Sequence, residues 1–282
     1  MEKLTGFYYV TAATGIEHIK KYAQYALKSL IKTGVDVNDI YCVVNALEEL
    51  KLVNKLIPDL LNVFCINEDL SKIKWTVHNG KRKFSVFKSG ALYKCFPKPK
   101  TDKAMVYFDT DVLFFKNPEP FLKTKCERTW FHHGKNLESV SVRKSRAGKH
   151  ITKNDVNIND YNSLRRWTSD PAAYCMIKHK AKKVPDREAV AGFYILHPRD
   201  HEKLLKLTYE NCLEIVKHFK DHVDVGDQKP MNAALNILEI DWWGGSRFEC
   251  PEHLEYFNHY FGVKQMKKEF NNKIRELGLN NE

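Results

Sequence analysis

Several features that mark common protein classes are scarce in this chain of 282 residues. The seven cysteines lie far apart and never form a Cys-x-x-Cys pair, so we expect reduced thiols in the core, and neither a disulfide framework nor a zinc motif. No stretch approaches the roughly 18–20 uncharged apolar residues of a membrane helix, and the first residues lack the pattern of a secretory leader. Internal repeats and low-complexity linkers are lacking too. We therefore expect a soluble, cytoplasmic protein with a single domain over residues 1–282.

The chain does contain enough apolar surface for a large core, and its charge is unevenly distributed. Hydrophobic residues make up 43% and aromatic residues 12% of the sequence, which disfavours disorder. The net charge is +11, and residues 123–183 carry fifteen Lys and Arg against five Asp and Glu. A basic segment of this kind attracts polyanions, and nucleic acid, an anionic glycan or a charged membrane face would each suit it. The same composition is equally typical of a solvated lysine-rich loop.

Apolar patterning predicts an α/β fold. Short apolar runs alternate with longer segments whose apolar residues recur every three or four positions, as in parallel strands joined by helices. The expected strands are residues 6–14, 39–45, 61–66, 104–108 and 192–196. The expected helices are residues 16–31, 46–56, 82–96, 200–219, 226–238 and a basic C-terminal helix at about 263–277. Residues 133–183 are polar and weakly periodic, and we expect the basic insertion of about 123–183 to be mobile or to face an acceptor.

The most informative segment follows the fourth expected strand. The apolar run AMVYF delivers Asp109 and Asp111 to its carboxyl end, where open α/β sheets bind their ligands. Two carboxylates one residue apart can converge on a hard divalent cation that also binds substrate phosphates. The pattern therefore indicates a site for a metal and a diphosphate. The alternative is that both aspartates only cap the next turn.

Four motifs occur in order along the chain. They are residues 9–14 (YVTAAT), residues 106–121 (VYFDTDVLFFKNPEPF), residues 226–232 (GDQKPMN) and residues 259–262 (HYFG). Together they resemble the nucleotide-binding turn, the Asp-x-Asp segment, the Asp-Gln-x-x-x-Asn helix start and the C-terminal His-x-x-Gly of glycosyltransferase family 8, which includes glycogenin. The resemblance covers nearly the whole chain. It implies a GT-A (Rossmann-like) α/β fold, with a mixed, mainly parallel sheet flanked by helices.

The resemblance also implies a role for each matching residue. In the family two aspartates and the late histidine hold Mn²⁺, which implies the same for Asp109, Asp111 and His259, with Mg²⁺ as the alternative metal. The residues implied to bind the nucleotide sugar are Thr11, Ala12, Thr14, Lys88, Asp109, Thr110, Asp111, Gly262 and Lys264. The residues implied to act near the reacting carbon of the donor are Asp227, Gln228 and Lys88, with Gln228 as a polar stabiliser. Arg82, Lys83 and Lys94 are the alternatives to Lys88.

The implied activity is metal-dependent transfer of a hexose from a UDP-linked sugar to an acceptor hydroxyl, with retention of anomeric configuration. The acceptor would be a glycan or an anionic polymer, nucleic acid included. The basic segment would also allow peripheral contact with anionic lipid. Two departures from the family pattern are Val190, where a polar residue is usual, and the lack of Pro-Trp after Lys264. The alternatives are a nucleic-acid-binding protein or metal-dependent nuclease that uses Asp109 and Asp111 differently, and a GT-A domain that binds without catalysis.

Overall fold

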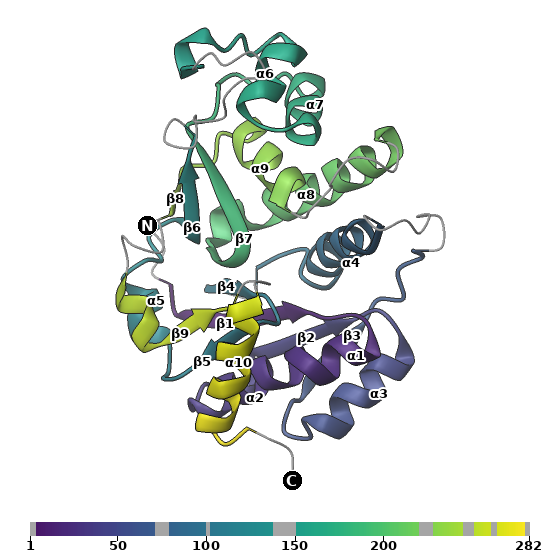
Figure 1. Ribbon diagram of the computed structural model, residues 1–282, viewed down its shortest axis with the longest axis vertical. Coiled ribbons are helices and arrows are strands. Elements are labelled where there is room, and N and C mark those ends of the chain that lie inside the picture. Colours follow the sequence, from purple (N-terminus) through teal and green to yellow (C-terminus); the bar gives the residue numbers. More distant parts are fainter. Residues whose placement is uncertain are drawn as a thin grey trace.

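The computed structural model describes residues 4–70, 79–99, 102–137, 151–219, 228–244, 251–260 and 264–279. Within these ranges a central sheet has the strand order β3-β2-β1-β4-β7-β6-β8, and a separate two-stranded sheet pairs β5 with β9 (Figure 1). The strands are β1 (Gly6–Ala12), β2 (Ile40–Val44), β3 (Asn62–Cys65), β4 (Lys103–Phe108), β5 (Val112–Phe114), β6 (Thr129–Asn136), β7 (Arg187–Leu196), β8 (Trp242–Gly244) and β9 (Phe257–His259).

The central sheet is mixed and mainly parallel. Strands β3, β2, β1 and β4 run parallel to one another, and β8 runs parallel to β6. Among the strands that the structure describes in this sheet, only β7 runs against its two neighbours, β4 and β6. The α/β class and the mixed, mainly parallel sheet expected from the sequence are therefore confirmed.

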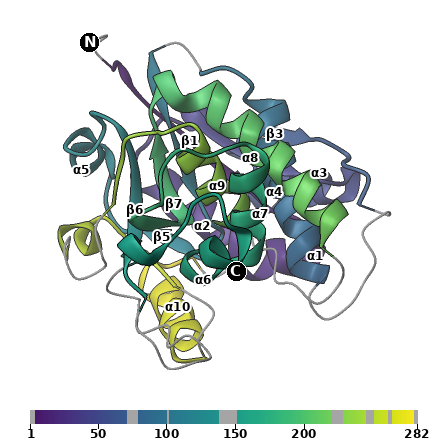
Figure 2. The same ribbon diagram turned by 90° about the horizontal axis from the view of Figure 1, so that it is seen from above.

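Helices cover both faces of this sheet. They are α1 (Ile16–His18), a π-helical segment (Ile19–Ala23), α2 (Gln24–Lys32), α3 (Leu47–Leu56), α4 (Asn79–Cys95), α5 (Glu119–Lys123), α6 (Tyr161–Trp167), α7 (Asp170–Lys178), α8 (Pro198–His218), α9 (Gln228–Ile237) and α10 (Lys264–Glu276). In Figure 1, α4, α8 and α9 lie on one side of the sheet and α1, α2 and α3 on the other. Figure 2 shows α5 and α10 toward one side of the molecule and α3 toward the other.

Successive residues of the central strands face two separate cores. Tyr9 of β1 packs in a core with Leu27 of α2. Its neighbour Tyr8 packs in a second core with Phe87 of α4 and Leu204 of α8. Because both faces of the sheet are covered, its parallel strands are continuous apolar runs, which is the signal that made them recognisable in the sequence.

The polar middle of the chain is more ordered than its weak periodicity indicates. Helices α6 and α7 pack with α8 and α9 around a small apolar core that includes Leu164, Met176 and Ile215. Residues 138–150 of the basic insertion lie outside the described residues.

Six of the seven cysteines lie in the described ranges, and all six are free thiols. Cys42, Cys175 and Cys212 are buried as predicted, whereas Cys65, Cys95 and Cys126 are only partly buried. Cys250 falls outside those ranges. Among the described helices, none combines the length and the apolar character needed to cross a membrane.

Candidate functional site

The two aspartates and the late histidine predicted as metal ligands come together. Asp109 directly follows β4, and Asp111 leads into β5, which pairs with β9 so that Val112 lies opposite His259. The backbone N–H of Tyr260 donates to the carbonyl of Asp111 at 2.9 Å, which ties β9 to the aspartate turn. One ligand atom from each of Asp109, Asp111 and His259 lies within 4.8 Å of the others. His259 Nε2 is 3.0 Å from Asp111 Oδ1 and 4.0 Å from Asp109 Oδ2.

A buried lysine and a tyrosine orient Asp109. Lys88 of α4 is 2% exposed, and its Nζ donates to Asp109 Oδ1 and to the carbonyl of Ala191, both at 2.9 Å. The Tyr107 hydroxyl donates to the same carboxylate oxygen at 2.8 Å, and the Lys88 ammonium lies 4.1 Å from the centre of the Tyr107 ring. Charge-assisted bonds of this kind fix the carboxylate. Lys88 therefore lies in the predicted site, with its ammonium bonded to protein oxygens.

The donor set fits a divalent transition metal. Asp111 Oδ1 is a buried carboxylate oxygen, and His259 Nε2 lies 3.0 Å from it. Burying a negative charge is costly unless a positive charge accompanies it, and a cation held by Asp111 and His259 would supply that charge. Two carboxylates with one imidazole suit Mn²⁺ better than Mg²⁺ or Ca²⁺, which prefer oxygen ligands alone.

The residues predicted to contact the nucleotide lie at the carboxyl end of β1. Thr11 and Ala12 are fully buried, whereas Thr14 is partly exposed, and its hydroxyl donates to Glu49 at 2.9 Å. The other oxygen of Glu49 accepts from the backbone N–H groups of Asn45 and Ala46 at 2.9 and 3.1 Å. Glu49, to which the sequence motifs assign no role, thus joins the turns after β1 and β2. Both turns lie at the edge where an α/β sheet binds ligands.

A histidine from the first helix also reaches the aspartate turn. His18 Nε2 lies 2.6 Å from the Thr110 hydroxyl. Burial lowers the pKa of His18, against the opposing effect of the charges on Asp111 and Asp109, and so favours the neutral ring. The sequence alone does not point to His18, because Thr110, the residue that it contacts, lies 92 positions away.

An irregularity in the pairing of β7 with β6 places Gly192 beside Asp109 and His259. Phe131 of β6 pairs with Tyr194, whereas His133, two residues on, pairs with Val190, so β7 has extra residues at this point. One of them, Gly192, accepts from the backbone N–H of Asp109 at 2.7 Å. A Cβ on Gly192 would lie 2.0 Å from Cε1 of His259, so glycine is needed for the ring to lie where it does.

The last two motifs are only partly described. Asn232 of α9 exchanges two hydrogen bonds with the backbone of Ala189 in β7, at 2.7 and 2.8 Å, and this pair anchors the helix that begins at Gln228. Asp227 and Gly262 lie outside the described residues. Lys264 is the first residue of α10, and its side chain is likewise outside what the structure describes.

The basic segment is less one-sided in three dimensions than in the sequence. Lys178 lies 2.7 Å from Glu214, and Lys182 and Lys183 lie 3.6 and 3.7 Å from Glu239. These acids come from outside the segment, so part of its positive charge is compensated within the described residues.

Comparison of the sequence with models of known protein families found no match, and comparison with curated protein sequences found none. Comparison with solved structures found the galactosyltransferase LgtC in complex with donor and acceptor sugar analogs, at 14% sequence identity and a TM-score of 0.48, over 95% of both chains. It also found mouse xyloside xylosyltransferase 1 in its apo form, at 14% identity and a TM-score of 0.42, over 89% of this chain and 83% of that one. Both of these proteins are glycosyltransferases by name.

Proposed function

We propose that this protein is a metal-dependent glycosyltransferase that moves a hexose from a UDP-linked sugar to an acceptor hydroxyl. The observation that carries the proposal is the convergence of Asp109, Asp111 and His259 at the carboxyl end of β4. These residues come from two of the four ordered motifs that resemble glycosyltransferase family 8. A chance match of sequence motifs would not require residues about 150 positions apart to meet in space.

In such a site some residues would bind the metal and others would position those ligands. Asp109, Asp111 and His259 would hold Mn²⁺, which when bound supplies positive charge next to the diphosphate leaving group. Lys88 and Tyr107 fix Asp109 Oδ1, so that Oδ2 remains on the side of His259. These two residues are positioning residues, because they act through the carboxylate.

Binding of the nucleotide is assigned to the turn after β1, with Thr11, Ala12 and Thr14, and to Thr110 of the aspartate turn. Gly262 and Lys264 are assigned to the diphosphate from the motif alone. The reacting carbon would lie near Asp227 and Gln228, where preorganised dipoles lower the barrier by stabilising developing charge. We propose retention of configuration, with attack of the acceptor on the same face that the diphosphate leaves. The proposed acceptor is a glycan or an anionic polymer.

The first experiment is calorimetric titration of UDP into the protein with and without Mn²⁺. We expect binding only with the metal, and we expect Asp109→Asn/Asp111→Asn to abolish it. The matched control is Glu48→Gln/Asp59→Asn, which removes two exposed carboxylates far from the site in sequence and should bind UDP like the wild type. Failure of UDP to bind the wild type under both conditions would refute the uridine donor.

Transfer itself is tested by the release of UDP from a panel of UDP-hexoses. Gln228→Ala should reduce kcat and leave the affinity for UDP unchanged, because the residue is assigned to the reacting carbon. Equal loss of UDP affinity and turnover would place Gln228 in donor binding instead. Steeply salt-dependent DNA binding, with no effect of UDP or Mn²⁺ on thermal stability, would favour a nucleic-acid-binding protein.

A further inference from the structure

Two consecutive histidines on β6 face each other where a regular strand would separate them. Adjacent side chains of a strand point to opposite faces of the sheet. At His132 and His133 the register with β7 shifts, and the two ring centroids lie 3.9 Å apart. Both side chains are buried, with 2% and 9% exposure. The irregularity in β7 thus places two imidazoles together inside the protein.

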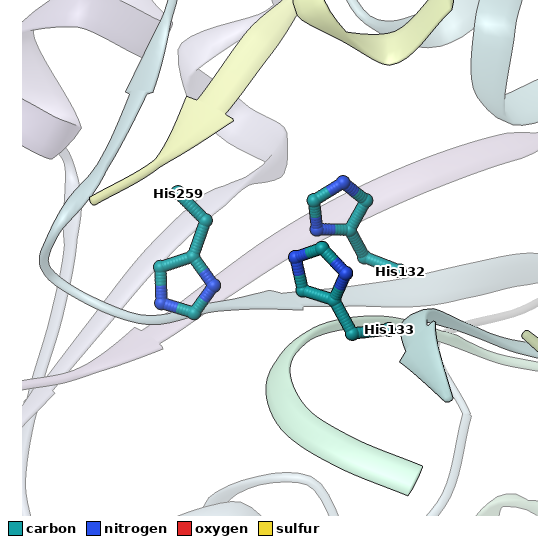
Figure 3. Close-up of side chains that lie close together, drawn as sticks. All are labelled: His132, His133 and His259. Carbon is teal, nitrogen blue, oxygen red and sulfur yellow. The ribbon is translucent and has the colours of Figure 1, made fainter. Parts of the chain in front are cut away.

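His259 is the third member of this cluster. One ligand atom from each of His132, His133 and His259 lies within 4.8 Å of the others, and Figure 3 shows the three rings turned toward a common space. In a tetrahedral zinc site with Zn–N bonds of about 2.0–2.1 Å, the nitrogens lie about 3.3 Å apart. The rings therefore need to approach by at most about 1.5 Å to enclose an ion, which side-chain rotation can supply.

We propose that His132, His133 and His259 form a second metal site, for a cation of the zinc class, that shares His259 with the carboxylate site. Three neutral imidazoles are the ligand set of a known class of zinc site, and nitrogen ligands favour Zn²⁺, Co²⁺ and Cu²⁺ over Mn²⁺. This site does not depend on the proposed transfer activity.

Sharing His259 makes the two sites compete. A neutral imidazole has one ring nitrogen with a free lone pair and one that carries the proton. In the carboxylate site His259 faces Asp111 through Nε2, at 3.0 Å. A cation bound to His132 and His133 takes the lone pair of the shared ring, and the carboxylate site then loses its only imidazole ligand. Zinc therefore weakens binding of Mn²⁺.

The direct test is X-ray absorption at the zinc edge of the chelator-stripped wild-type protein loaded with one equivalent of Zn²⁺. We expect scattering from three imidazoles. Two or fewer would overturn the proposal, because the carboxylate site offers only one. This measurement uses the wild type, so it holds even where a histidine variant fails to fold.

Calorimetry with Zn²⁺ separates the two sites by mutation. Asp109→Asn/Asp111→Asn should keep its zinc affinity within threefold, whereas His132→Asn/His133→Asn should lose at least tenfold. The control His179→Ala/His218→Ala removes two exposed histidines and should bind zinc like the wild type. Loss of zinc in the aspartate variant, with retention in the histidine variant, would overturn the proposal.

Competition is measured by the electron paramagnetic resonance signal of free Mn²⁺. Zn²⁺ should release Mn²⁺ from the wild type at a concentration at least tenfold lower than from His132→Asn/His133→Asn. Equal concentrations would mean that zinc displaces Mn²⁺ directly at the carboxylates, and the shared-ligand proposal would fail. Neither readout requires UDP or a sugar, so failure here is distinguishable from failure of the proposed transferase.

Discussion

Replacing Gly192 by alanine tests the packing that holds His259 beside its carboxylate partners. The added Cβ would lie 2.0 Å from Cε1 of His259 and 2.9 Å from each ring nitrogen, whereas ordinary contact begins at about 3.4 Å. The ring must therefore move by about 1.4 Å. Metal–ligand distances tolerate only about 0.2 Å, so this movement removes His259 as a ligand. We expect the affinity for Mn²⁺ to fall at least tenfold and the overpacking to cost about 1–3 kcal/mol of stability.

The assays are calorimetric titration of Mn²⁺ and urea unfolding. The control is Gly6→Ala, another strand position, where a Cβ meets no atom nearer than 3.9 Å. It should change the free energy of unfolding by less than about 0.5 kcal/mol. In a His259→Ala background the clash is absent, so Gly192→Ala should cost little there. The resulting double-mutant cycle should give a coupling energy of about 1–3 kcal/mol between the two positions.

Two results would refute this reasoning. Wild-type Mn²⁺ affinity in Gly192→Ala would mean that His259 is not a ligand or that its ring does not lie against Gly192. An equal loss of stability from Gly192→Ala with and without His259 would mean that the cost comes from the strand backbone and has no connection with the histidine ring.

Three further changes test the supports of the site and the core. Lys88→Met removes the cation beside Asp109 and should cost about 1–3 kcal/mol in urea unfolding, and Mn²⁺ affinity unaffected by it would contradict a positioning role. Asn232→Ala leaves the N–H and carbonyl of Ala189 without their partner and should cost at least about 2 kcal/mol by the same assay. A cost under about 0.5 kcal/mol would contradict the anchoring of α9 by this hydrogen-bond pair. Burial lowers the pKa of His201 below its usual value. Below pH about 6.5 the unfolded chain therefore binds more protons than the folded chain. As the pH falls further, the free energy of unfolding decreases by up to about 1.4 kcal/mol per pH unit until the pKa of the folded state is reached. His201→Gln should therefore show a smaller fall in the free energy of unfolding between pH 7 and 5 than the wild type, and an identical fall would refute the assignment.

The central strands could be predicted because burial on both faces leaves a local signal. β1, β2 and β4 each appear in the sequence as an uninterrupted apolar run, and the structure places each within about two residues of the predicted bounds. The four-residue β3 was predicted as well, whereas β5, β6, β8 and β9 were not. β5 and β9 have three residues each and exist only because they pair with each other across the fold. The first half of β7 begins with the charged pair Arg-Glu and continues with three small or medium apolar residues, so its apolar run is too short to stand out in the sequence.

The helical region after β1 shows a different limit of prediction from the sequence. Apolar residues every three or four positions predicted one helix over residues 16–31, and the structure has α1, a π-helical segment at Ile19–Ala23 and α2 in its place. A π-helix adds one residue to a turn, and the average spacing of apolar residues hardly changes. The helical region was therefore predictable, but its internal irregularity was not.

Some residues of the candidate site could likewise be predicted from the sequence, and others could not. Asp109, Asp111 and His259 could be proposed from the order of motifs, because each motif is a short local pattern. Gly192 and the pair His132–His133 could not, because their importance comes from a shift in register between β6 and β7. A strand bulge depends on how two distant segments pair, and no single segment encodes it.

The irregular part of β7 contacts Lys88, Asp109 and His259 of the candidate site. The carbonyl of Ala191 accepts from Lys88, and the carbonyl of Gly192 accepts from the backbone N–H of Asp109. The bare Cα of Gly192 leaves room for the ring of His259. The same register shift brings together the two histidines of β6. A substitution in this bulge should therefore weaken both proposed metal sites, whereas a substitution at Asp111 or at His132 should weaken only one of them. Comparing metal binding by the three variants distinguishes a residue that supports both sites from residues that bind one metal directly.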